Sequence, residues 1–202
     1  WAFRISYVGE QGFELYFDFD SGLPLWDQLF ALGVVPIGVE TYANSRRLEK
    51  SLRLQNADLE TDFNLYEAGL ERSVVKKAAF HGKSAYLAQR GLDQQTSYLC
   101  TLVMLANEDA EGIKRYPIGE WPILDADTGL VVIDAKGRRS FSTSISYGPS
   151  LGRNLLLAYL PADRAIVGET FILEYFCEHY PIRVEAVGST PVLDPDNERP
   201  RS

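Results

Sequence analysis

The hydrophobic and polar positions change their pattern along the chain near residue 94. Before it, residues 2–8 and 13–19 alternate between apolar and polar side chains, and a glycine-containing turn at residues 9–12 separates them. Strict alternation is typical of half-buried strands. The two segments therefore predict a β-hairpin.

Helical spacing follows the predicted hairpin. Apolar residues recur three and four positions apart between residues 21 and 33, and a charged stretch covers residues 40–51. Both patterns predict helices, as does the shorter segment 83–90. Short strands are expected at residues 34–39 and 66–75.

The segment after residue 94 reads as a series of apolar strands separated by Gly, Pro and Asp turns. The predicted strands are 98–105, 121–124, 130–134, 141–147, 155–160, 170–175 and 182–187. Regular strands with turns about every ten residues indicate a small antiparallel barrel or sandwich. The fold class predicted is therefore α+β. Residues 193–202 have no apolar period and are expected to form an exposed end.

Composition narrows the function classes. Hydrophobic residues make up 46% and charged residues 24% of the 202 residues, which is usual for a globular protein. The formal net charge of -8 argues against nucleic acid as a partner, although a local cluster of arginines can still bind a small anion. No apolar run reaches about 18 residues, so no membrane span is predicted. No secretory signal is visible, and the cytoplasm is the predicted location.

The cysteines give no sign of a metal centre. Cys100 and Cys177 are far apart and each lies in an apolar run, which predicts two buried free thiols. A disulfide between the two cysteines is the alternative interpretation. With only two histidines and two cysteines, none close together, a zinc site is not expected. The chain also lacks a phosphate-binding loop, a nucleophile elbow and a dinucleotide fingerprint.

Several short motifs nevertheless follow one another in order. They are Tyr7-x-Gly9-Glu10-x-Gly12-x-Glu14, Arg47-Leu48-Glu49 with Asp58 after it, Leu65-Tyr66-Glu67-Ala68-Gly69-Leu70, Phe80-x-Gly82-Lys83, Tyr147-Gly148-Pro149-Ser150-Leu151-Gly152-Arg153 and Asp194-Pro195-Asp196-Asn197-Glu198-Arg199. Together they resemble the glycine-cleavage T-protein (aminomethyltransferase) family over nearly the whole chain. Any one of these motifs alone would be weak evidence.

The resemblance implies a fold, an activity and partners. It implies the C-terminal part of a folate-binding α+β core over residues 1–92, followed by an antiparallel β-barrel domain over residues 93–202. The implied activity is transfer of a one-carbon unit to tetrahydrofolate. In the glycine-cleavage enzyme the donor is an aminomethyl group on the lipoyl arm of a carrier protein, so such a carrier is the implied partner.

The same resemblance assigns cofactor-binding roles to Glu14 and Tyr7. Glu14 would grip the pterin ring, because a carboxylate can accept two hydrogen bonds from a ring N–H and an adjacent amino group. Tyr7 would line the same pocket. From the residues alone, an ordinary solvent-facing strand residue is the favoured interpretation of Glu14, and Tyr7 is equally a packing residue.

The other polar motif residues are expected to have structural roles. Glu10 is expected to be a turn partner, Arg47 and Glu49 a buried ion pair, and Glu67 a brace for the core. His81, His179 and Arg153 are expected at the surface. No catalytic residue is assigned, since the catalytic Asp of the family belongs to the part that precedes this segment.

Some positions depart from the family pattern. Ala43 stands where the glycine-cleavage enzymes have a ligand-holding arginine, and Leu52 replaces an aromatic residue. The resemblance therefore does not identify the one-carbon donor. A folate domain of the sarcosine or dimethylglycine dehydrogenase type, a folate-dependent demethylase, a non-catalytic folate-binding module and a scaffold without ligand are the alternatives. The chain opens without Met, so we expect an N-terminally truncated segment that is inactive alone, or at best a weak folate binder.

Overall fold

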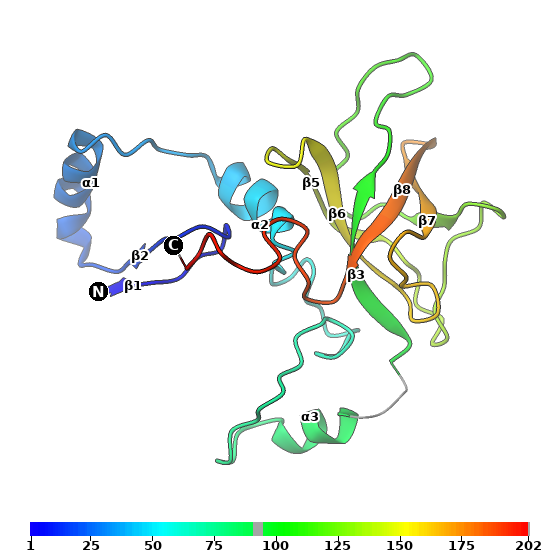
Figure 1. Cartoon of the computed structure of the whole chain (residues 1–202), viewed down its shortest axis with the longest axis horizontal. Helices are drawn as coiled ribbons and strands as arrows, with labels where there is room; N and C mark the ends of the chain where they lie inside the picture. The colour runs from blue at the N-terminus through cyan, green and yellow to red at the C-terminus, as the bar shows by residue number, and fades with distance from the viewer. Residues whose placement is uncertain (91–94, 202) are drawn as a thin grey trace.

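The computed structural model describes residues 1–90 and 95–201. Its second half is a strongly curled, six-stranded antiparallel sheet with the order β4-β7-β8-β3-β6-β5 (Figure 1). The strands are β3 (Ser97–Met104), β4 (Ile123–Asp125), β5 (Ser142–Gly148), β6 (Arg153–Pro161), β7 (Thr170–Tyr175) and β8 (Glu178–Val187). All but one of the predicted strands of this half are present.

Backbone hydrogen bonds join the two edges of this sheet. The N–H of Ile123 donates to the carbonyl of Ser140 at 3.0 Å, and the N–H of Ser142 donates to the carbonyl of Trp121 at 2.8 Å. The bridge of Pro122 with Phe141 therefore brings the start of β4 beside the start of β5 and curls the sheet toward closure. This confirms the predicted antiparallel barrel and the α+β class.

The predicted strand at 130–134 forms only isolated bridges, with Val131 opposite Leu124 and Ile133 opposite Arg139. Aspartate side chains cause the interruption. Asp125 accepts the N–H of Thr128 at 2.8 Å, and Asp134 accepts the N–H groups of the residues that follow it. Such local bonds compete with a strand ladder and turn the backbone.

The central strands β3 and β6 are buried on both faces. In β6, Leu156, Ala158 and Leu160 face the barrel interior, whereas Leu155 and Leu157 face the first half of the chain. Alternate residues of a strand point to opposite faces, so one strand supplies two cores. The outer core also holds Leu48, Ala68, Leu99, Val103 and Tyr159.

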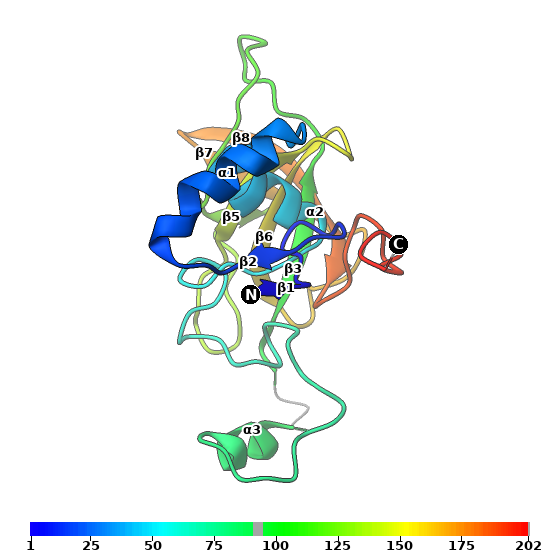
Figure 2. The same cartoon turned by 90° about the vertical axis from the view of Figure 1, so that its left-hand side faces the viewer.

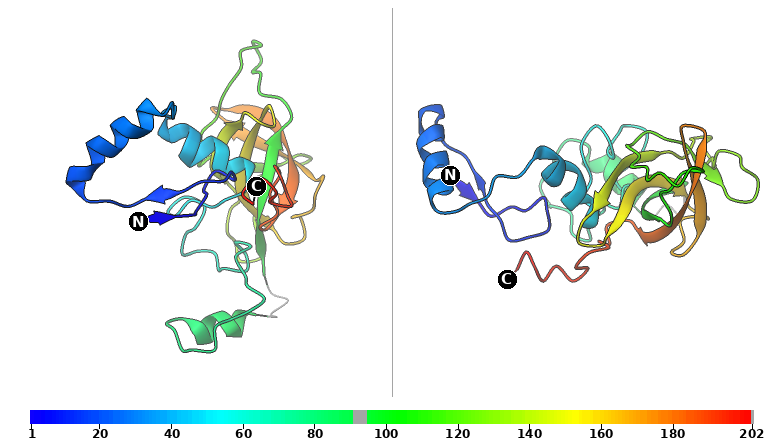
Figure 3. Two further views of the ribbon diagram at one scale, coloured as in Figure 1. Left: turned by 60° about the vertical axis from the view of Figure 1, so that its left-hand side comes forward. Right: turned by 90° about the horizontal axis from the view of Figure 1, so that it is seen from above.

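The first half of the chain is open. Its elements are β1 (Ala2–Phe3), β2 (Glu14–Leu15), η1 (Phe19–Ser21), α1 (Gly22–Ala31), η2 (Thr41–Arg46), α2 (Arg47–Glu49) and α3 (Lys83–Gln89). The β1–β2 hairpin and α1 lie away from the barrel, on the far side of η2 and α2 (Figures 1 and 3). No residue of α1 is buried, and α3 stands apart below the barrel (Figure 2).

The predicted hairpin is present but shorter than expected. Only Ala2 opposite Leu15 and Phe3 opposite Glu14 pair, and Phe13 is 59% exposed. A two-stranded ribbon with no layer against its apolar face has little to stabilise longer strands. The helices expected at 21–33, 40–51 and 83–90 are confirmed.

Two expected strands of the first half are wrong. Residues 34–38 pair with no other strand in the described structure. Residues 66–75 begin in turns, because the side-chain carbonyl of Asn64 accepts the N–H groups of Tyr66 and Glu67, both at 2.9 Å. This Asx turn diverts the backbone from an extended path. The predicted domain boundary near residue 92 lies outside the described residues.

The tail is docked rather than free. The N–H of Leu193 donates to the carbonyl of Glu49 at 2.9 Å, and the ammonium of Lys50 donates to the Asp194 carboxylate at 3.2 Å. Residues 193 and 194 are half-buried, whereas residues 195–199 and 201 are exposed, so the prediction of an exposed end was wrong for its start. The C-terminus thereby lies beside the N-terminal hairpin (Figure 1).

The two cysteines differ in exposure. Cys100 is buried in β3, and burial raises the pKa of its thiol to about 12. Cys177 is exposed, so the prediction of two buried thiols was wrong for it. Phe176 and Cys177 both have positive φ, at 51° and 64°, in the turn between β7 and β8. Such two-residue hairpin turns project their side chains outward.

Among the residues described, no helix combines the length and the apolar character needed to cross a membrane.

Candidate functional site

The glycine segment, which comprises residues 7–14, is built around Gly9. Its φ is 72°, and a Cβ added there would lie 2.1 Å from Cγ of Lys50. Residue 9 therefore needs both the left-handed conformation and the absence of a side chain. The N–H of Glu10 then donates to the Ser6 hydroxyl at 3.0 Å, which closes the turn.

Replacing Gly9 by Ala should lower stability more than the conformational strain alone would. Gly112→Ala is the matched control, because Gly112 also has positive φ, at 79°, but nothing lies within 4 Å of its Cβ position. We expect a penalty of about 1 kcal/mol for Gly112→Ala and a clearly larger one for Gly9→Ala, measured by urea denaturation. Equal losses would show that Lys50 moves aside freely.

Arg46 connects the glycine segment to the barrel. Its guanidinium donates to the Glu10 carboxylate, to Glu49 at 3.0 Å and to the Ser150 hydroxyl at 2.5 Å. Glu49 in turn accepts the N–H of Ser150 at 2.6 Å. These contacts confirm Glu10 as a turn and hydrogen-bond partner. They place the glycine segment, α2 and the β5–β6 hairpin in one network.

Arg47 forms a second, fully buried network. Arg47, Glu49 and Asp58 are all 0% exposed, and Arg47 pairs with Asp58 at 2.7 Å. The expectation that these residues are structural is confirmed, but Arg47 does not pair with Glu49. Helix residues two positions apart point in different directions, so each finds its own partner.

Glu67 braces the core as expected. Its carboxylate accepts from the Arg138 guanidinium at 2.5 Å and from the N–H of Asn64 at 3.0 Å. Burial opposes ionisation of Glu67, but these hydrogen bonds outweigh it and lower the pKa. The Arg138 guanidinium also lies 4.2 Å from the centre of the Phe63 ring. His81, His179 and Arg153 are exposed, as expected.

Glu14 lies on β2 at the half-exposed side of the hairpin. The Tyr16 hydroxyl donates to its Oε2 at 2.8 Å, and no other described residue contributes a side-chain hydrogen bond to the carboxylate. This bond raises the pKa of Tyr16, and the nearby Tyr42 adds to the rise. The Glu14 carboxylate therefore keeps acceptor capacity for a ligand that offers N–H donors.

Tyr7 is more enclosed than Glu14. Its hydroxyl donates to the carbonyl of Arg53 at 2.9 Å, and its ring centre lies 5.4 Å from that of Tyr42. Burial raises its pKa. With the hydroxyl already engaged, Tyr7 can offer a ligand only its ring.

The two predicted cofactor-binding residues do not touch each other. Glu14 accepts a hydrogen bond from Tyr16, and Tyr7 lies beside Tyr42. Tyr16 was detectable from the sequence, since it is two positions from Glu14 and so shares its strand face. Tyr42 was not, because its place beside Tyr7 depends on the packing of η2. A carboxylate and aromatic rings are groups that suit a flat, hydrogen-bonding heterocycle.

Comparisons with known proteins agree with this arrangement. Residues 1–78 match the model of the GCVT N-terminal domain family. An aminomethyltransferase from Koribacter versatilis (strain Ellin345) is 30% identical over 197 residues, covering 92% of this chain and 46% of that relative. The chain belongs to the glycine cleavage T-protein family.

Two other similar proteins are a longer enzyme and a protein of known crystal structure. The mitochondrial dimethylglycine dehydrogenase of Homo sapiens is 32% identical over 186 residues, which is 89% of this chain and 20% of that enzyme. The crystal structure of glycine cleavage system aminomethyltransferase T from Bartonella henselae has a similar fold, with a TM-score of 0.76 and 22% identity. It is matched over 96% of this chain and 50% of its own length. The chain thus spans about half the length of the aminomethyltransferases that it matches.

Proposed function

We propose that the chain is part of a tetrahydrofolate-dependent one-carbon transferase, with residues 1–92 contributing to the folate-binding core and residues 93–202 forming the barrel domain. The observation that carries the proposal is the match to an aminomethyltransferase over 92% of the chain. The accessible carboxylate of Glu14, oriented by Tyr16, supports it. The cytoplasm stays the predicted compartment.

Tetrahydrofolate would carry the one-carbon unit when bound, and this chain would bind and orient it. Glu14 would accept hydrogen bonds from the pterin edge, and the ring of Tyr7 would form a wall. The residues fit such a ligand, because Glu14 keeps free acceptor positions while its orientation is held by Tyr16. A lipoyl carrier protein is the proposed donor-bearing partner if the aminomethyl reaction applies.

The exposed apolar side chains indicate where the rest of such a fold would pack. Large apolar residues with more than half of their surface exposed crowd the first 39 positions; they include Trp1, Phe13, Phe19, Leu23, Trp26, Phe30, Leu32 and Val35. Many exposed large apolar side chains in one segment indicate an interaction face. Because the chain spans about half of its aminomethyltransferase relatives, we propose that the other half of the fold covers this face and completes the folate site.

A second candidate function is the folate domain of a dimethylglycine dehydrogenase-like enzyme. Two observations favour it: the 32% identity to the human enzyme, and Ala43 at the position of the ligand-holding arginine. Arg47 does not compensate, since its guanidinium is fully buried against Asp58. Both candidates place tetrahydrofolate at Glu14 and differ in the donor.

The test of the folate site is a variant at Glu14. We expect Glu14→Gln to weaken binding of 5-formyltetrahydrofolate about tenfold or more, because it removes a charge-assisted hydrogen bond worth roughly 1.5–3 kcal/mol. Binding is measured by isothermal titration calorimetry with the 202-residue chain together with the N-terminal half of an aminomethyltransferase, and with the 202-residue chain alone. Asp18→Asn is the matched control, since Asp18 is an exposed carboxylate shortly after the same strand.

Three results would contradict the assignment in different ways. Equal affinity of Glu14→Gln and the parent chain would remove Glu14 from the site. Equal weakening by Asp18→Asn would mean that the loss of a nearby negative charge, rather than of a contact with Glu14, weakens folate binding. If the 202-residue chain alone does not bind, the chain together with the N-terminal half of an aminomethyltransferase decides. An absence of binding there would reject the folate site.

A further inference from the structure

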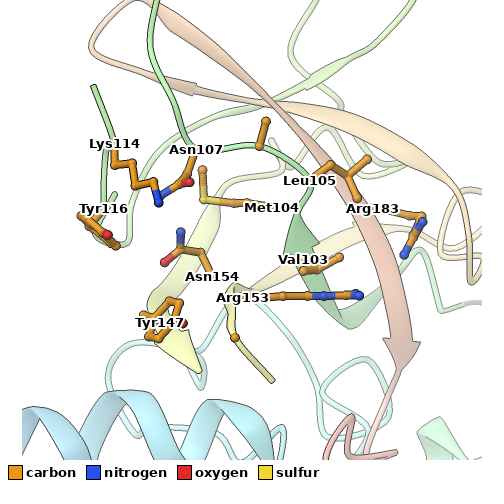
Figure 4. Close-up of a pocket in the computed structure, with 12 residues that line it drawn as sticks. Val103, Met104, Leu105, Asn107, Lys114, Tyr116, Tyr147, Arg153, Asn154 and Arg183 are labelled. Atoms are coloured by element: carbon orange, nitrogen blue, oxygen red, sulfur yellow. The ribbon is translucent and has the colours of Figure 1, made fainter. Parts of the chain in front are cut away.

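A groove on the outside of the barrel carries positive charge. It has a volume of about 590 Å³ and lies between the β5–β6 hairpin, the end of β3 and the loop after it (Figure 4). Lys114, Arg153 and Arg183 line it together with Tyr116 and Tyr147, and no acidic side chain is among its lining residues. A basic groove is notable in a chain whose formal net charge is -8.

The cations stand at two ends of the groove. Lys114 lies at one end, near Asn107, and Arg153 and Arg183 extend toward the other (Figure 4). Arg183 pairs with Glu185 at 2.6 Å. Within residues 1–90 and 95–201, neither Lys114 nor Arg153 forms an ion pair. Two positive positions are therefore available to a ligand.

An amide lies between these ends. Asn154 as a whole is only 6% exposed, and its side chain points into the groove between Met104 and Tyr147 (Figure 4). No described residue forms a hydrogen bond with its carboxamide. Among the described residues, Tyr180 alone has a buried side-chain polar atom without a partner, so the polar atoms of the Asn154 amide reach the solvent in the groove. The amide is therefore accessible to a polar ligand.

We propose that this groove binds a small dicarboxylate. One carboxylate would meet Lys114, and the other would meet the guanidinium groups of Arg153 and Arg183, which match the planar fork of a carboxylate. Glu185 reduces the charge at the arginine end, which suits a singly charged carboxylate better than a doubly charged phosphate. Asn154 would then donate to or accept from the ligand between its ends.

This site is separate from the proposed folate site. None of its lining residues is Glu14, Tyr7, Tyr16 or Tyr42. A failure of either proposal therefore leaves the other standing. The groove lies on the barrel, and all of its lining residues belong to residues 103–183.

The test uses nuclear magnetic resonance of the ¹⁵N-labelled 202-residue chain. Glutarate is titrated at constant ionic strength, and acetate and inorganic phosphate are titrated in parallel. We expect saturable shifts of the Asn154 side-chain amide with glutarate. Lys114→Gln and Arg153→Gln should each weaken the apparent affinity about tenfold, the loss expected for a charge-assisted hydrogen bond. Both residues are exposed, so both variants should fold.

Arg139→Gln is the matched control, because Arg139 is an exposed arginine of the barrel outside the groove. Its affinity for glutarate should equal that of the parent chain. An absence of saturable shifts would overturn the site, as would equal weakening by Arg139→Gln. Acetate binding as tight as glutarate would overturn the two-ended ligand, and tighter binding of phosphate would overturn the carboxylate assignment.

Discussion

Replacing Arg47 by Met should destabilise the chain by about 3–5 kcal/mol, the range for removing one partner of a buried ion pair. The variant would leave Asp58 charged and 0% exposed with its main counterion gone. It would also leave the carbonyl of Leu52 and the hydroxyl of Ser144 without the donors that now reach them at 3.0 and 2.6 Å. Urea denaturation followed by circular dichroism measures the loss.

A second substitution separates charge from packing. Asp58→Asn keeps one acceptor oxygen, which can serve the N–H of Leu54, now at 2.8 Å, while its NH2 group can donate to the hydroxyl of Thr143, and it removes the charge. We therefore expect the double variant Arg47→Met/Asp58→Asn to be more stable than Arg47→Met alone.

The control for this prediction is an exposed ion pair. Arg183→Met breaks the pair with Glu185, whose two side chains are 39% and 24% exposed. Such surface pairs contribute about 0–1 kcal/mol. A loss of that size for Arg47→Met would mean that water reaches Asp58 and that the network does not hold α2 against β5.

The Arg47 network illustrates what sequence reasoning could and could not find. The family motif drew attention to Arg47, Glu49 and Asp58, and their burial was anticipated for the first two. Which carboxylate pairs with Arg47 depends on how residues 52–58 fold back beneath the helix. That path is a tertiary result, and the helix period only excludes Glu49 as the partner.

The barrel was the most predictable part of the fold. The predicted bounds 170–175 coincide with β7 (Thr170–Tyr175), because apolar alternation and flanking turns agree there. The strands expected at 130–134 and 66–75 failed for one shared reason. Asp134 and Asn64 bind nearby backbone N–H groups, and these bonds compete with strand pairing without changing the apolar pattern.

The site was less predictable than the fold. Glu14 and Tyr7 were singled out by resemblance, and the structure adds Tyr16 beside Glu14 and Tyr42 beside Tyr7. Asn154 reads in the sequence as an ordinary strand residue. Its significance depends on the β5–β6 register, which sets it opposite Tyr147, and on the absence of a partner for its amide in the described structure.

Arg138→Met should cost roughly 3 kcal/mol at neutral pH, toward the lower end of the range for a broken buried pair because 17% of the arginine side chain is exposed. Arg138 binds two carboxylates at once, Glu67 at 2.5 Å and Asp134 at 2.7 Å, and each of these is 1% exposed. The variant leaves both buried charges without their shared counterion. It also removes the cation from the face of Phe63.

The pH dependence of this loss distinguishes the ion pair from simple packing. Burial raises the pKa of Asp134, but hydrogen bonds from Arg138 and from two hydroxyls outweigh it and set the pKa to about 2. The pKa of Glu67 is also lowered. Because ordinary carboxyl pKa values are about 4, the two carboxylates contribute stability above about pH 4, and it is lost as the pH falls through their folded pKa values.

Without Arg138 the folded pKa values of Glu67 and Asp134 should rise, since the guanidinium no longer offsets the effect of burial. The deficit of Arg138→Met should therefore be largest near pH 7 and should shrink as the pH falls from about 4 toward about 2, where protonation neutralises both carboxyls in either protein. Urea denaturation of the parent chain and of the variant across this range measures the difference. A deficit that stays constant with pH would assign the role of Arg138 to its packing on Phe63 rather than to its charge.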